Sequence, residues 1–384
     1  MGDIEQYRKS IDDIDKKIIE LFQERMEVVT KVARYKKENN LPIYNGNRED
    51  QVIEKNVSRI EDDSLKPFAR EFILSMMDIS KKYQSVELSK GEASSSYINE
   101  EKPFYKEKDL RLGYQGVNGS YSEEALLSFF GDKHKTSNYE RFEDVFEALN
   151  KNEIDFGVLP IENSSTGAVK EVYDLLRKYG FFIVAEKCIK IEHHLLGIEG
   201  AKEEDLREIY SHPQGFEQCS VYLNNLKDVK SIPYFNTAIS AEHVSKEGIK
   251  EKGAIASKRA ADIFNLSVIK EGISNEEDNF TRFIIVGKNI INNSSNNKIS
   301  VVFAVENKAG ALFNALKWFS VNNLNMIKIE SRPIAKEPWK YFFYIDFEGN
   351  IKDIVVKDLL ESFEKSSSYF KLLGVYRREL DVCN

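Results

Sequence analysis

The first thirty-five residues carry the pattern of one long amphipathic helix. Apolar or aromatic residues recur there at a spacing of three and four, at Ile4, Tyr7, Ile11, Ile14, Ile18, Leu21, Val28, Val32 and Tyr35. A helix buries such a stripe against partner helices. Arg25 falls within the stripe, and a buried guanidinium needs a nearby anion to offset the cost of its desolvation. The pattern therefore predicts an all-helical region with a pocket for a small anion.

Two further cationic side chains are candidates to line this pocket. Lys36 returns to nearly the same helix face as Arg25, about 16 Å along the axis. Arg8 lies about 25 Å from Arg25, so it cannot reach the same small molecule from the same chain. If Arg8 belongs to the pocket, it comes from a second copy, and the site is built across a helical dimer. Alternatively, Arg25 fixes the helix register or pairs with a carboxylate of a neighbouring helix.

Two shorter helices are expected after the long one. The long helix ends just before Pro42, because proline forces the preceding residue out of the helical conformation. A second helix begins at about Asn47, and a third begins near Pro67, a residue suited to a first helical turn. On the third helix Ser80 and Gln84 lie one turn apart on the same face.

The polar residues of these helices resemble those of the all-helical chorismate mutase of bacterial bifunctional P-proteins, over about residues 1–90. The matching positions are Arg8, Arg25, Lys36, Asn45, Arg48, Glu49, Ser80 and Gln84. The resemblance implies that the arginines bind the carboxylates of chorismate, with one arginine supplied by the partner chain. It also implies that Lys36 and Gln84 donate to the ether oxygen and that Glu49 accepts from the ring hydroxyl. Asn45 replaces the usual Asp, so we expect weaker binding with activity retained.

The rearrangement of chorismate suits these residue types. It is a concerted shift that requires no nucleophile, no proton transfer and no metal. Catalysis instead needs the dianion held in a compact conformation and cations directed at the oxygen that gains negative charge. Arginine forks suit carboxylates, whereas a compact ammonium suits a single oxygen. We therefore expect no cofactor and no metal site.

A change of pattern marks a second module. Residues 91–108 are rich in serine and charge without apolar periodicity, which is typical of a linker. Strands are then expected near 110–114, 154–159, 181–187, 207–210, 232–236, 253–256 and 282–287. Helices are expected near 121–130, 141–150, 167–179, 214–225, 238–247 and 258–264. This alternation over 109–288 indicates an α/β fold with a mostly parallel sheet.

Polar loops follow several of these expected strands, at 113–123, 160–167 and 211–214. Parallel sheets bind ligands beyond the carboxyl ends of their strands, and exposed amides at helix starts attract carboxylates. Taken singly, each loop is also explained by helix capping, as Ser120 with Glu123 forms a capping box. The loop at 160–167 carries more polar groups than one helix start needs, which favours a ligand site.

Four motifs in this module resemble those of prephenate dehydratase, over roughly 108–288. They are Gly-Ser-Tyr-Ser at 119–122, Pro-Ile-Glu-Asn-Ser at 160–164, Ser-His-Pro-Gln at 211–214 and Thr-Arg-Phe at 281–283. The resemblance implies two α/β lobes around a cleft, as in a periplasmic binding protein. It places the two crossings of the chain between lobes near 164–169 and 267–281.

The resemblance also implies roles for individual residues. Prephenate dehydratase expels carbon dioxide and the ring hydroxyl together, which leaves an aromatic ring. Thr281 is the expected catalytic residue, and because a hydroxyl is a weak acid we interpret it as a donor to the leaving oxygen. Arg282 alternates to the other face of its strand, so we expect it outside the site. The substrate-binding residues expected from the matching motifs are Glu162, Asn163, Ser211 and Gln218.

A third module follows a second linker at 289–298. Its expected order is strand 299–305, helix 310–321, strands 324–331 and 340–347, helix 351–365 and strand 370–377, within 299–384. This βαββαβ order is ferredoxin-like. The module resembles an ACT domain, which binds amino acids at dimer interfaces. The resemblance implies inhibition by L-phenylalanine bound at Gly310, Ala311, Leu312, Glu330, Ser331 and Arg332.

Composition agrees with three domains and limits the classes of partner. The chain has 384 residues, 41% of them hydrophobic, enough to fill separate cores. A net charge of −8 argues against a nucleic-acid partner. Three widely separated cysteines predict reduced thiols in a cytoplasmic enzyme. The acidic start predicts no signal peptide, and no apolar run is long enough for a membrane span.

The sequence thus predicts a multidomain, bifunctional enzyme of phenylalanine biosynthesis. It would convert chorismate to prephenate and prephenate to phenylpyruvate, under inhibition by L-phenylalanine, as a homodimer at least. Two alternatives stay open: a fused mutase with a dehydratase that acts on arogenate, and a non-catalytic amino-acid sensor. The presence of Lys36, Glu49, Gln84 and Thr281 together argues against the sensor, because a mere binder needs neither donors to the ether oxygen nor a donor to the leaving group.

Overall fold

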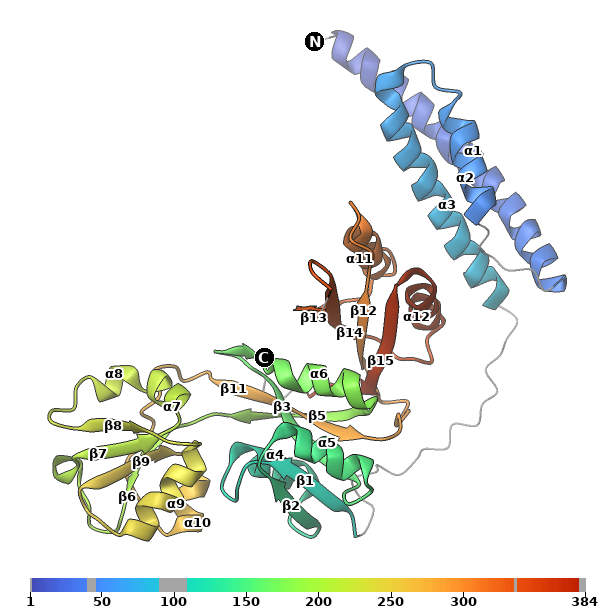
Figure 1. The fold of residues 1–384 in the computed structure, drawn as a ribbon. Helices are drawn as coiled ribbons and strands as arrows, with labels where there is room; N and C mark the ends of the chain where they lie inside the picture. The colour runs from blue at the N-terminus through green and yellow to red at the C-terminus, as the bar shows by residue number, and fades with distance from the viewer. Residues whose placement is uncertain (1, 40–45, 90–108, 335–336, 380–384) are drawn as a thin grey trace. The chain divides into compact units, whose positions relative to one another are not determined.

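The computed structural model describes residues 2–39, 46–89, 109–334 and 337–379. The chain divides into two compact units, Met1–Tyr97 and Ile98–Asn384. The first unit is all-helical, with α1 (Gly2–Glu38), α2 (Gly46–Val57), a short 3₁₀ turn η1 (Asp63–Leu65) and α3 (Lys66–Ser89) (Figure 1). The three helices expected from the sequence are confirmed.

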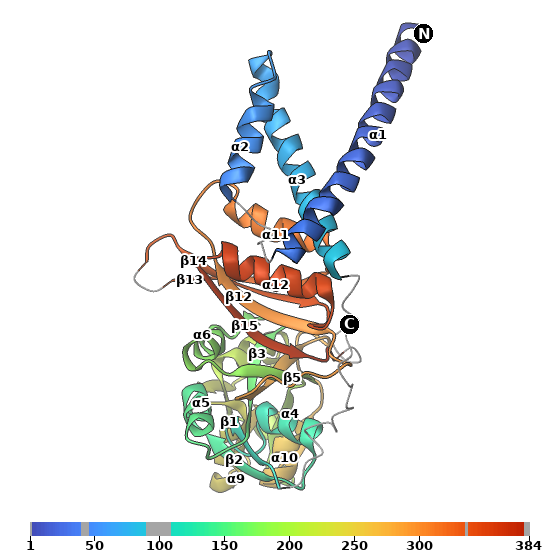
Figure 2. The ribbon, with the colours of Figure 1, turned by 90° about the vertical axis from the view of Figure 1, so that its right-hand side faces the viewer.

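Only the C-terminal part of α1 is covered within one chain. Met26, Val29 and Ala33 of α1 are buried, and Met77 is buried on α3. Towards its N-terminus α1 diverges from the other two helices (Figure 2), and the side chain of Ile14 is 55% exposed. Most of the apolar stripe, including Tyr7, Ile11, Ile18 and Leu21, is exposed. A single chain therefore does not bury the stripe as the sequence pattern predicts.

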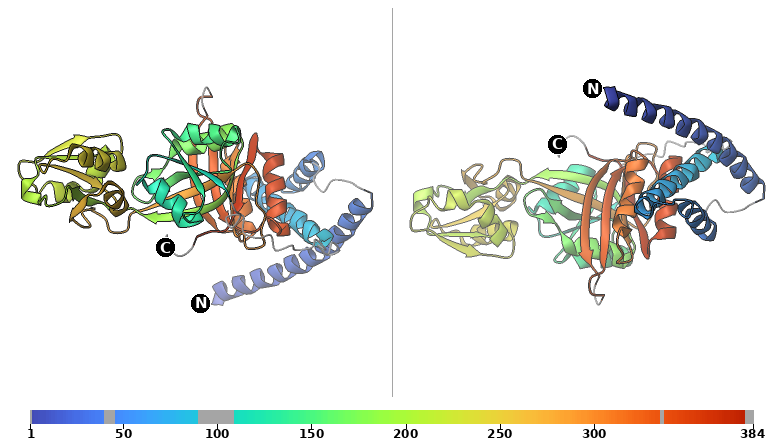
Figure 3. Two further views of the ribbon diagram at one scale, coloured as in Figure 1. Left: turned by 90° about the horizontal axis from the view of Figure 1, so that it is seen from below. Right: turned by 90° about the horizontal axis from the view of Figure 1, so that it is seen from above.

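The second unit contains two sheets that form two lobes and a C-terminal domain (Figure 3). The first lobe has strands β1 (Arg111–Gln115), β2 (Lys135–Tyr139), β3 (Phe156–Asn163), β4 (Gly167–Ala168), β5 (Phe182–Lys190) and β11 (Phe280–Gly287). Its strand order is β5-β11-β3-β1-β2, with β4 beside β3. Its helices are α4 (Tyr121–Phe130), α5 (Phe142–Asn150) and α6 (Lys170–Tyr179).

The second lobe is built on a five-stranded sheet of order β10-β6-β9-β7-β8. The strands are β6 (His194–Gly197), β7 (Glu208–Ser211), β8 (Lys230–Pro233), β9 (Lys252–Ala256) and β10 (Ser267–Lys270). Its helices are η3 (Glu203–Asp205), α7 (Pro213–Gln218), α8 (Ser220–Leu223), α9 (Thr237–Glu247) and α10 (Lys258–Phe264).

Three expectations about this two-lobed region are wrong. Both sheets are mixed, since β11 runs antiparallel to β3 and to β5, and β6 runs antiparallel to its two neighbours. The chain leaves the first lobe between β5 and β6 rather than near 164–169, because β4, α6 and β5 all stay with the first lobe. The helix expected at 214–225 is divided into α7 and α8.

The C-terminal domain has the predicted βαββαβ order. Its elements are β12 (Lys298–Ala304), α11 (Ala311–Val321), β13 (Met326–Pro333), β14 (Tyr341–Glu348), α12 (Ile354–Ser366) and β15 (Tyr369–Tyr376). Its antiparallel sheet, of order β13-β14-β12-β15, joins the first lobe where Gly374 pairs with Ile183. A Cβ at Gly374 would lie 2.3 Å from the carbonyl oxygen of Ile183, so this approach requires glycine.

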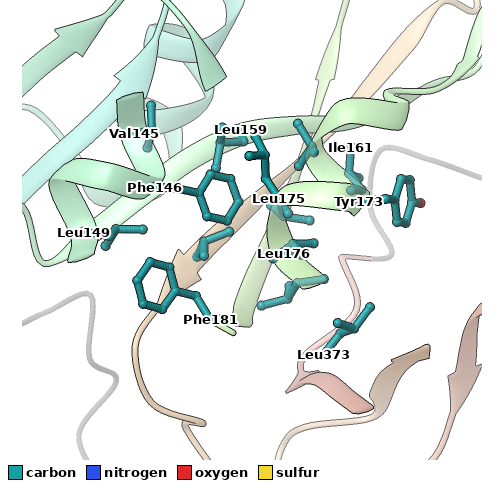
Figure 4. Close-up of a cluster of buried hydrophobic side chains, with 14 of the residues drawn as sticks. Val145, Phe146, Leu149, Leu159, Ile161, Tyr173, Leu175, Leu176, Phe181 and Leu373 are labelled. Atoms are coloured by element: carbon teal, nitrogen blue, oxygen red, sulfur yellow. The ribbon is translucent and has the colours of Figure 1, made fainter. Parts of the chain in front are cut away.

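One hydrophobic core extends from the first lobe into the C-terminal domain. Phe146 of α5, Leu159 of β3 and Leu176 of α6 are fully buried, and Leu373 of β15 belongs to the same cluster (Figure 4). Apolar area removed from water stabilises the association of packed elements by about 25 cal/mol per Å². The shared core therefore fixes the C-terminal domain against the first lobe.

Two of the cysteines lie in the described part of the chain and differ in state. Cys188 is disulfide-bonded, which corrects the expectation of reduced thiols throughout, whereas Cys219 is free and buried. Burial raises the pKa of the Cys219 thiol to about 12.

In the described part of the chain no helix has the length and apolar character that crossing a bilayer requires.

Candidate active sites

The helical unit brings Arg25 of α1 together with Ser80 and Gln84 of α3. The Arg25 guanidinium donates to the Ser80 hydroxyl, which in turn donates to the carbonyl oxygen of Met76 at 2.6 Å. Ser80 and Gln84 are both buried. Burial lowers the pKa of Arg25, and among the described residues no carboxylate forms an ion pair with it. A half-buried cation without a carboxylate partner among the described residues is suited to binding an anion.

Gln84 gives a second sign of a ligand at this place. Its buried carbonyl oxygen Oε1 has no hydrogen-bond partner among the residues described by the structure. A buried polar atom left unpaired costs about 1–3 kcal/mol, and such atoms are rare in folded proteins. A polar ligand that bonds to Gln84 would remove this cost.

Of the remaining residues expected in the mutase site, only Lys36 and Arg8 have described side chains. Lys36 is half-buried further along α1, and Arg8 is exposed on the part of α1 that lacks a covering helix. Asn45 lies outside the described residues. Arg48 and Glu49 are on α2, but their side chains also lie outside the described part of the structure.

In the two-lobed region Asn163 and Thr281 form a buried pair. Asn163 ends β3 and lies opposite Thr281 of β11 in the strand register. The amide nitrogen Nδ2 of Asn163 donates to Thr281 Oγ1 at 2.9 Å and to Asn279 Oδ1 at 2.7 Å. Because the Thr281 oxygen accepts this bond, its own hydroxyl proton remains available to a ligand.

The turn after β3 holds the Asn163 side chain in one orientation. Its oxygen Oδ1 accepts from the backbone nitrogens of Ser165 and Thr166, both at 3.0 Å. Thr166 Oγ1 accepts from Gln214 Nε2 of the second lobe at 3.0 Å. The polar loop at 160–167 thus positions the Asn163–Thr281 pair and contacts the opposite lobe.

A pocket of about 130 Å³ lies beside this pair. Its walls combine the turn after β3, the end of α7 and the segment that returns to the first lobe. The lining residues are Ser165, Thr166, Glu217, Gln218, Ser274, Asn275, Glu276 and Asn279. Contacts between the lobes include Ser257 Oγ to the carbonyl oxygen of Gly119 at 3.3 Å, and an ion pair of Arg259 with Glu123 at 3.1 Å.

His193 is a residue of this cleft that the sequence argument missed. It lies where the chain first crosses between lobes, and its ring nitrogen Nε2 is 2.8 Å from Gln218 Oε1. An amide oxygen only accepts, so His193 donates, and the amide nitrogen of Gln218 is left to serve the pocket. The run Glu192-His193-His194 gave no signal, because only the fold brings His193 to the end of α7.

The buried His193 gives a prediction about pH. Burial lowers its pKa below the ordinary value of 6.5, so below that pH the unfolded chain binds more protons than the folded chain. The stability due to the neutral ring is complete above the ordinary pKa and is lost as the pH falls through the lowered one. When the pH is lowered from 7.5 to 5, we expect the midpoint temperature of thermal unfolding to fall less for His193→Gln than for wild type.

Melting curves measured across that pH range test this prediction. An equal acid-induced fall of the midpoint in wild type and His193→Gln would show that His193 does not titrate as argued.

Glu162 and Ser211 are placed differently from the expectation of substrate contact. Glu162 faces away from Asn163 and forms ion pairs with Arg282, at 2.5 Å, and with Lys328. Ser211 is fully buried within the second lobe, where its hydroxyl donates to the carbonyl oxygen of Ile255 at 3.1 Å. Alternation along a strand sends neighbouring side chains to opposite faces, which explains why Glu162 leaves the site.

The residues expected to bind phenylalanine lie on α11 and β13. Gly310 caps α11 with a positive φ of 77°, a conformation that favours glycine, and Ala311 with Leu312 forms the first turn. Glu330, Ser331 and Arg332 lie on β13. Arg332 forms an ion pair with Asp174 of α6 at 2.8 Å. Among the described residues no group of His, Cys, Asp and Glu is suited to hold a metal ion.

Family models match both functional regions of the chain. Residues 7–85 match chorismate mutase type II, and residues 112–290 match prephenate dehydratase. A solved structure, a prephenate dehydratase from Arthrobacter aurescens in complex with L-Phe, is 27% identical with a TM-score of 0.65. The match covers 70% of this chain and 90% of that one.

Two relatives extend the comparison. The chain is 38% identical over 287 residues to arogenate dehydratase/prephenate dehydratase 1 of Arabidopsis thaliana, which covers 71% of this chain and 73% of the relative. It is 31% identical over 387 residues to the bifunctional chorismate mutase/prephenate dehydratase of Buchnera aphidicola subsp. Schizaphis graminum. That match covers 98% of this chain and 97% of the relative. The chain thus belongs to the family of bifunctional chorismate mutase/prephenate dehydratases.

Proposed function

We propose that the helical unit rearranges chorismate to prephenate and that the two-lobed region converts prephenate to phenylpyruvate. The observation that carries the proposal is the match over almost the full length of bifunctional relatives, with both sites on one chain. Two sets of polar groups suited to these reactions support it: half-buried Arg25 with buried Gln84, and the buried pair of Asn163 and Thr281.

In the mutase site the protein would act by electrostatics and position. Arg25, held by Ser80, binds one carboxylate of chorismate, while Gln84 and Lys36 interact with the ether oxygen. As the carbon–oxygen bond breaks, negative charge grows on that oxygen, and fixed donors stabilise it more in the transition state than in the ground state. The new carbon–carbon bond forms in the same step, so no proton is transferred.

In the dehydratase site Thr281 would assist the departure of the ring hydroxyl. The carboxylate leaves as carbon dioxide, its bonding electrons make the ring aromatic, and the hydroxyl leaves with the electron pair of its carbon–oxygen bond. Thr281 donates a hydrogen bond to that oxygen while Asn163 holds the threonine oxygen, and a proton from solvent completes the water product. Gln218, oriented by His193, offers its amide nitrogen to a substrate carboxylate.

The size of the pocket bears on how substrate enters. Its volume of about 130 Å³ is below the range of about 300–1,000 Å³ usual for small-molecule sites. We infer that the lobes separate at the contacts of Gly119 with Ser257 and of Glu123 with Arg259 to admit prephenate. Closure would then exclude water from the reacting ring.

We further infer a homodimer formed through the exposed stripe of α1. The side chains of Ile4, Tyr7, Ile11 and Ile14 are 58, 68, 56 and 55% exposed in one chain, an apolar row too long for a solvated helix face. A second copy would cover this row and bring its own Arg8 to the pocket of Arg25. Ile14→Glu is expected to yield monomers and to lower mutase activity by at least about 10-fold, since the added charge would be buried in the seam.

Sedimentation and mutase assays on full-length protein test the dimer. Gln23→Glu adds the same charge to the opposite, exposed face of α1 and is expected to change neither result. A fully active, dimeric Ile14→Glu protein would rule out this interface.

The C-terminal domain would serve as an ACT domain that binds L-phenylalanine. Its βαββαβ order, the glycine that caps α11 and the polar residues on β13 support this reading, as does the solved relative in complex with L-Phe. We infer that phenylalanine bound there inhibits the dehydratase.

Assays with three substrates test the proposed function. Purified protein is given chorismate, prephenate or arogenate, with and without L-phenylalanine, and prephenate, phenylpyruvate and phenylalanine are measured. We expect turnover of the first two, suppressed by phenylalanine at the dehydratase step. A clear preference for arogenate would favour the activity named for the Arabidopsis relative, and no turnover of any substrate would favour a sensor.

A further inference from the structure

Six charged side chains gather behind the Asn163–Thr281 pair, on the opposite face of β3 and β11. We call them the ionic cluster: Glu162, Glu186, Arg282, Lys298, Lys328 and Asp346. The three acids and three bases make the cluster formally neutral. Glu186, Arg282, Lys298 and Asp346 are buried, and Glu162 and Lys328 lie at its edge, with side chains 30% and 15% exposed.

Arg282 is the centre of the cluster. Its guanidinium contacts three carboxylates, with Nε 2.5 Å from Glu162, one terminal nitrogen 3.1 Å from Glu186 and the other 2.9 Å from Asp346. Burial acts to lower the pKa of Arg282, but the surrounding carboxylates raise it well above its ordinary value. A planar guanidinium held on three sides has one permitted orientation.

Half of the cluster comes from the C-terminal domain. Lys298 of β12 donates to Glu186 at 2.7 Å, and Lys328 of β13 pairs with Glu162. Asp346 of β14 accepts from Ser300 at 2.6 Å as well as from Arg282. Removing one partner of such a buried set leaves an uncompensated charge, so the cluster requires the two domains to stay in register.

The cluster is joined directly to the dehydratase site through the backbone. Glu162 directly precedes Asn163 on β3, and Arg282 directly follows Thr281 on β11. The strand register pairs Arg282 with Glu162 and Thr281 with Asn163. Neighbouring residues face opposite sides of a sheet. A shift of the Glu162–Arg282 pair on one face would therefore move the Asn163–Thr281 pair on the other.

Strand β13 also forms a second ion pair with the two-lobed region. Lys328 and Arg332 are four positions apart on β13, so they share a face. They form ion pairs with Glu162 and with Asp174 of α6, respectively. Glu330 lies between them on the same strand. The strand expected to bind an amino acid is thus held at two points to the domain whose activity it would regulate.

We propose that Arg282 is a positioning residue for Thr281 and that the Lys328–Glu162 pair couples strand β13 to it. Amino acid bound at β13 would shift Lys328, and the shift would pass through Glu162 and Arg282 to the strand that carries Thr281. This inference rests on the proposed inhibition by L-phenylalanine. A cluster that only holds the domains together would affect stability without altering inhibition.

A double-mutant cycle in the full-length protein tests the coupling. The variants are Lys328→Met, Glu162→Gln and the two combined, with Lys340→Met as the matched control. Lys340 also forms an ion pair, with Glu337 at 2.7 Å, but both side chains are exposed and outside the cluster. For each protein kcat and KM for prephenate, the phenylalanine concentration that halves the rate, and direct phenylalanine binding are measured. Mutase activity in the same samples reports whether the chain is folded.

The proposal predicts a specific separation of these quantities. Lys328→Met should bind phenylalanine within about 3-fold of wild type yet need at least about 10-fold more of it for half-inhibition, a typical size of coupling between sites. The second change should then add little, since both remove the same pair. Lys340→Met should behave as wild type.

Other results of these experiments would contradict the proposal. Wild-type inhibition retained unchanged in Lys328→Met and in the double variant would overturn the coupling while leaving the proposed function intact. A wild-type enzyme that phenylalanine does not inhibit would overturn both. As a check on positioning, Arg282→Lys should lower kcat more than it raises KM, and an unaltered kcat in a folded Arg282→Lys protein would contradict the role of Arg282.

Discussion

Thr281→Ala is expected to lower kcat for prephenate dehydration by roughly 100-fold, the usual cost of losing one donor to an oxygen that gains charge. The KM for prephenate should change much less, because the lost bond forms mainly in the transition state. Thr281 is buried and its oxygen already accepts from Asn163. Stopped assays of phenylpyruvate formation from prephenate measure the effect.

Two comparisons isolate the hydroxyl group. Thr281→Ser keeps the donor and should retain most of the activity, whereas Thr281→Val keeps the shape and should be as poor as alanine. Chorismate mutase activity in each variant should equal that of wild type, because it resides in the other unit. A Thr281→Val enzyme with near-normal kcat would remove the hydroxyl from the mechanism.

Arg25→Ala should have the reverse pattern. In the proposed site the guanidinium binds a carboxylate of chorismate, so we expect its removal to lower chorismate turnover by roughly 100- to 1,000-fold. Prephenate turnover should be unchanged. Consumption of chorismate followed by absorbance measures the loss, and the rate of the uncatalysed rearrangement is subtracted.

Arg34 offers a matched control for this result. It lies on α1 but is exposed, so Arg34→Ala should retain full mutase activity. Arg25→Lys keeps the charge but loses the fork, and it should rank between wild type and alanine. Equal loss of both activities in Arg25→Ala, with the fold intact, would show that the two functions are not separable as described.

The helical unit was predictable because its signals are local. Periodicity and Pro42 predicted the extent of α1, and Arg25, which falls within the stripe, is half-buried and donates to Ser80. The sequence could not show that one chain leaves Ile11 and Ile14 uncovered. The amphipathic pattern reports which face is apolar and says nothing of which molecule covers it.

In the two-lobed region the errors have a common physical origin. The strand β2, Lys135–Tyr139, is an edge strand of mostly polar residues, so it has no apolar alternation to detect. The site of the first crossing depends on which sheet α6 and β5 join, a choice made by long-range packing. His193 and Gln218 are also brought together only by the fold, 25 positions apart in the chain.

Glu162 shows the limit of transferring roles by motif. It stands beside Asn163 in the same short motif, yet the pleat of β3 turns it towards Arg282 and Lys328. The alternation that predicted Arg282 outside the site also applied to Glu162. Strand periodicity, applied to every residue of the motif, would have separated Asn163 from Glu162.

A complementation assay tests the central claim that one chain carries two separate active sites. Phenylpyruvate formed from chorismate is measured for wild type, for Arg25→Ala, for Thr281→Ala, and for an equal mixture of the two variants. We expect formation by wild type, little by either variant alone, and restored formation by the mixture, because released prephenate passes from the intact mutase to the intact dehydratase. A mixture as inactive as its components, with both proteins folded, would contradict two independent sites.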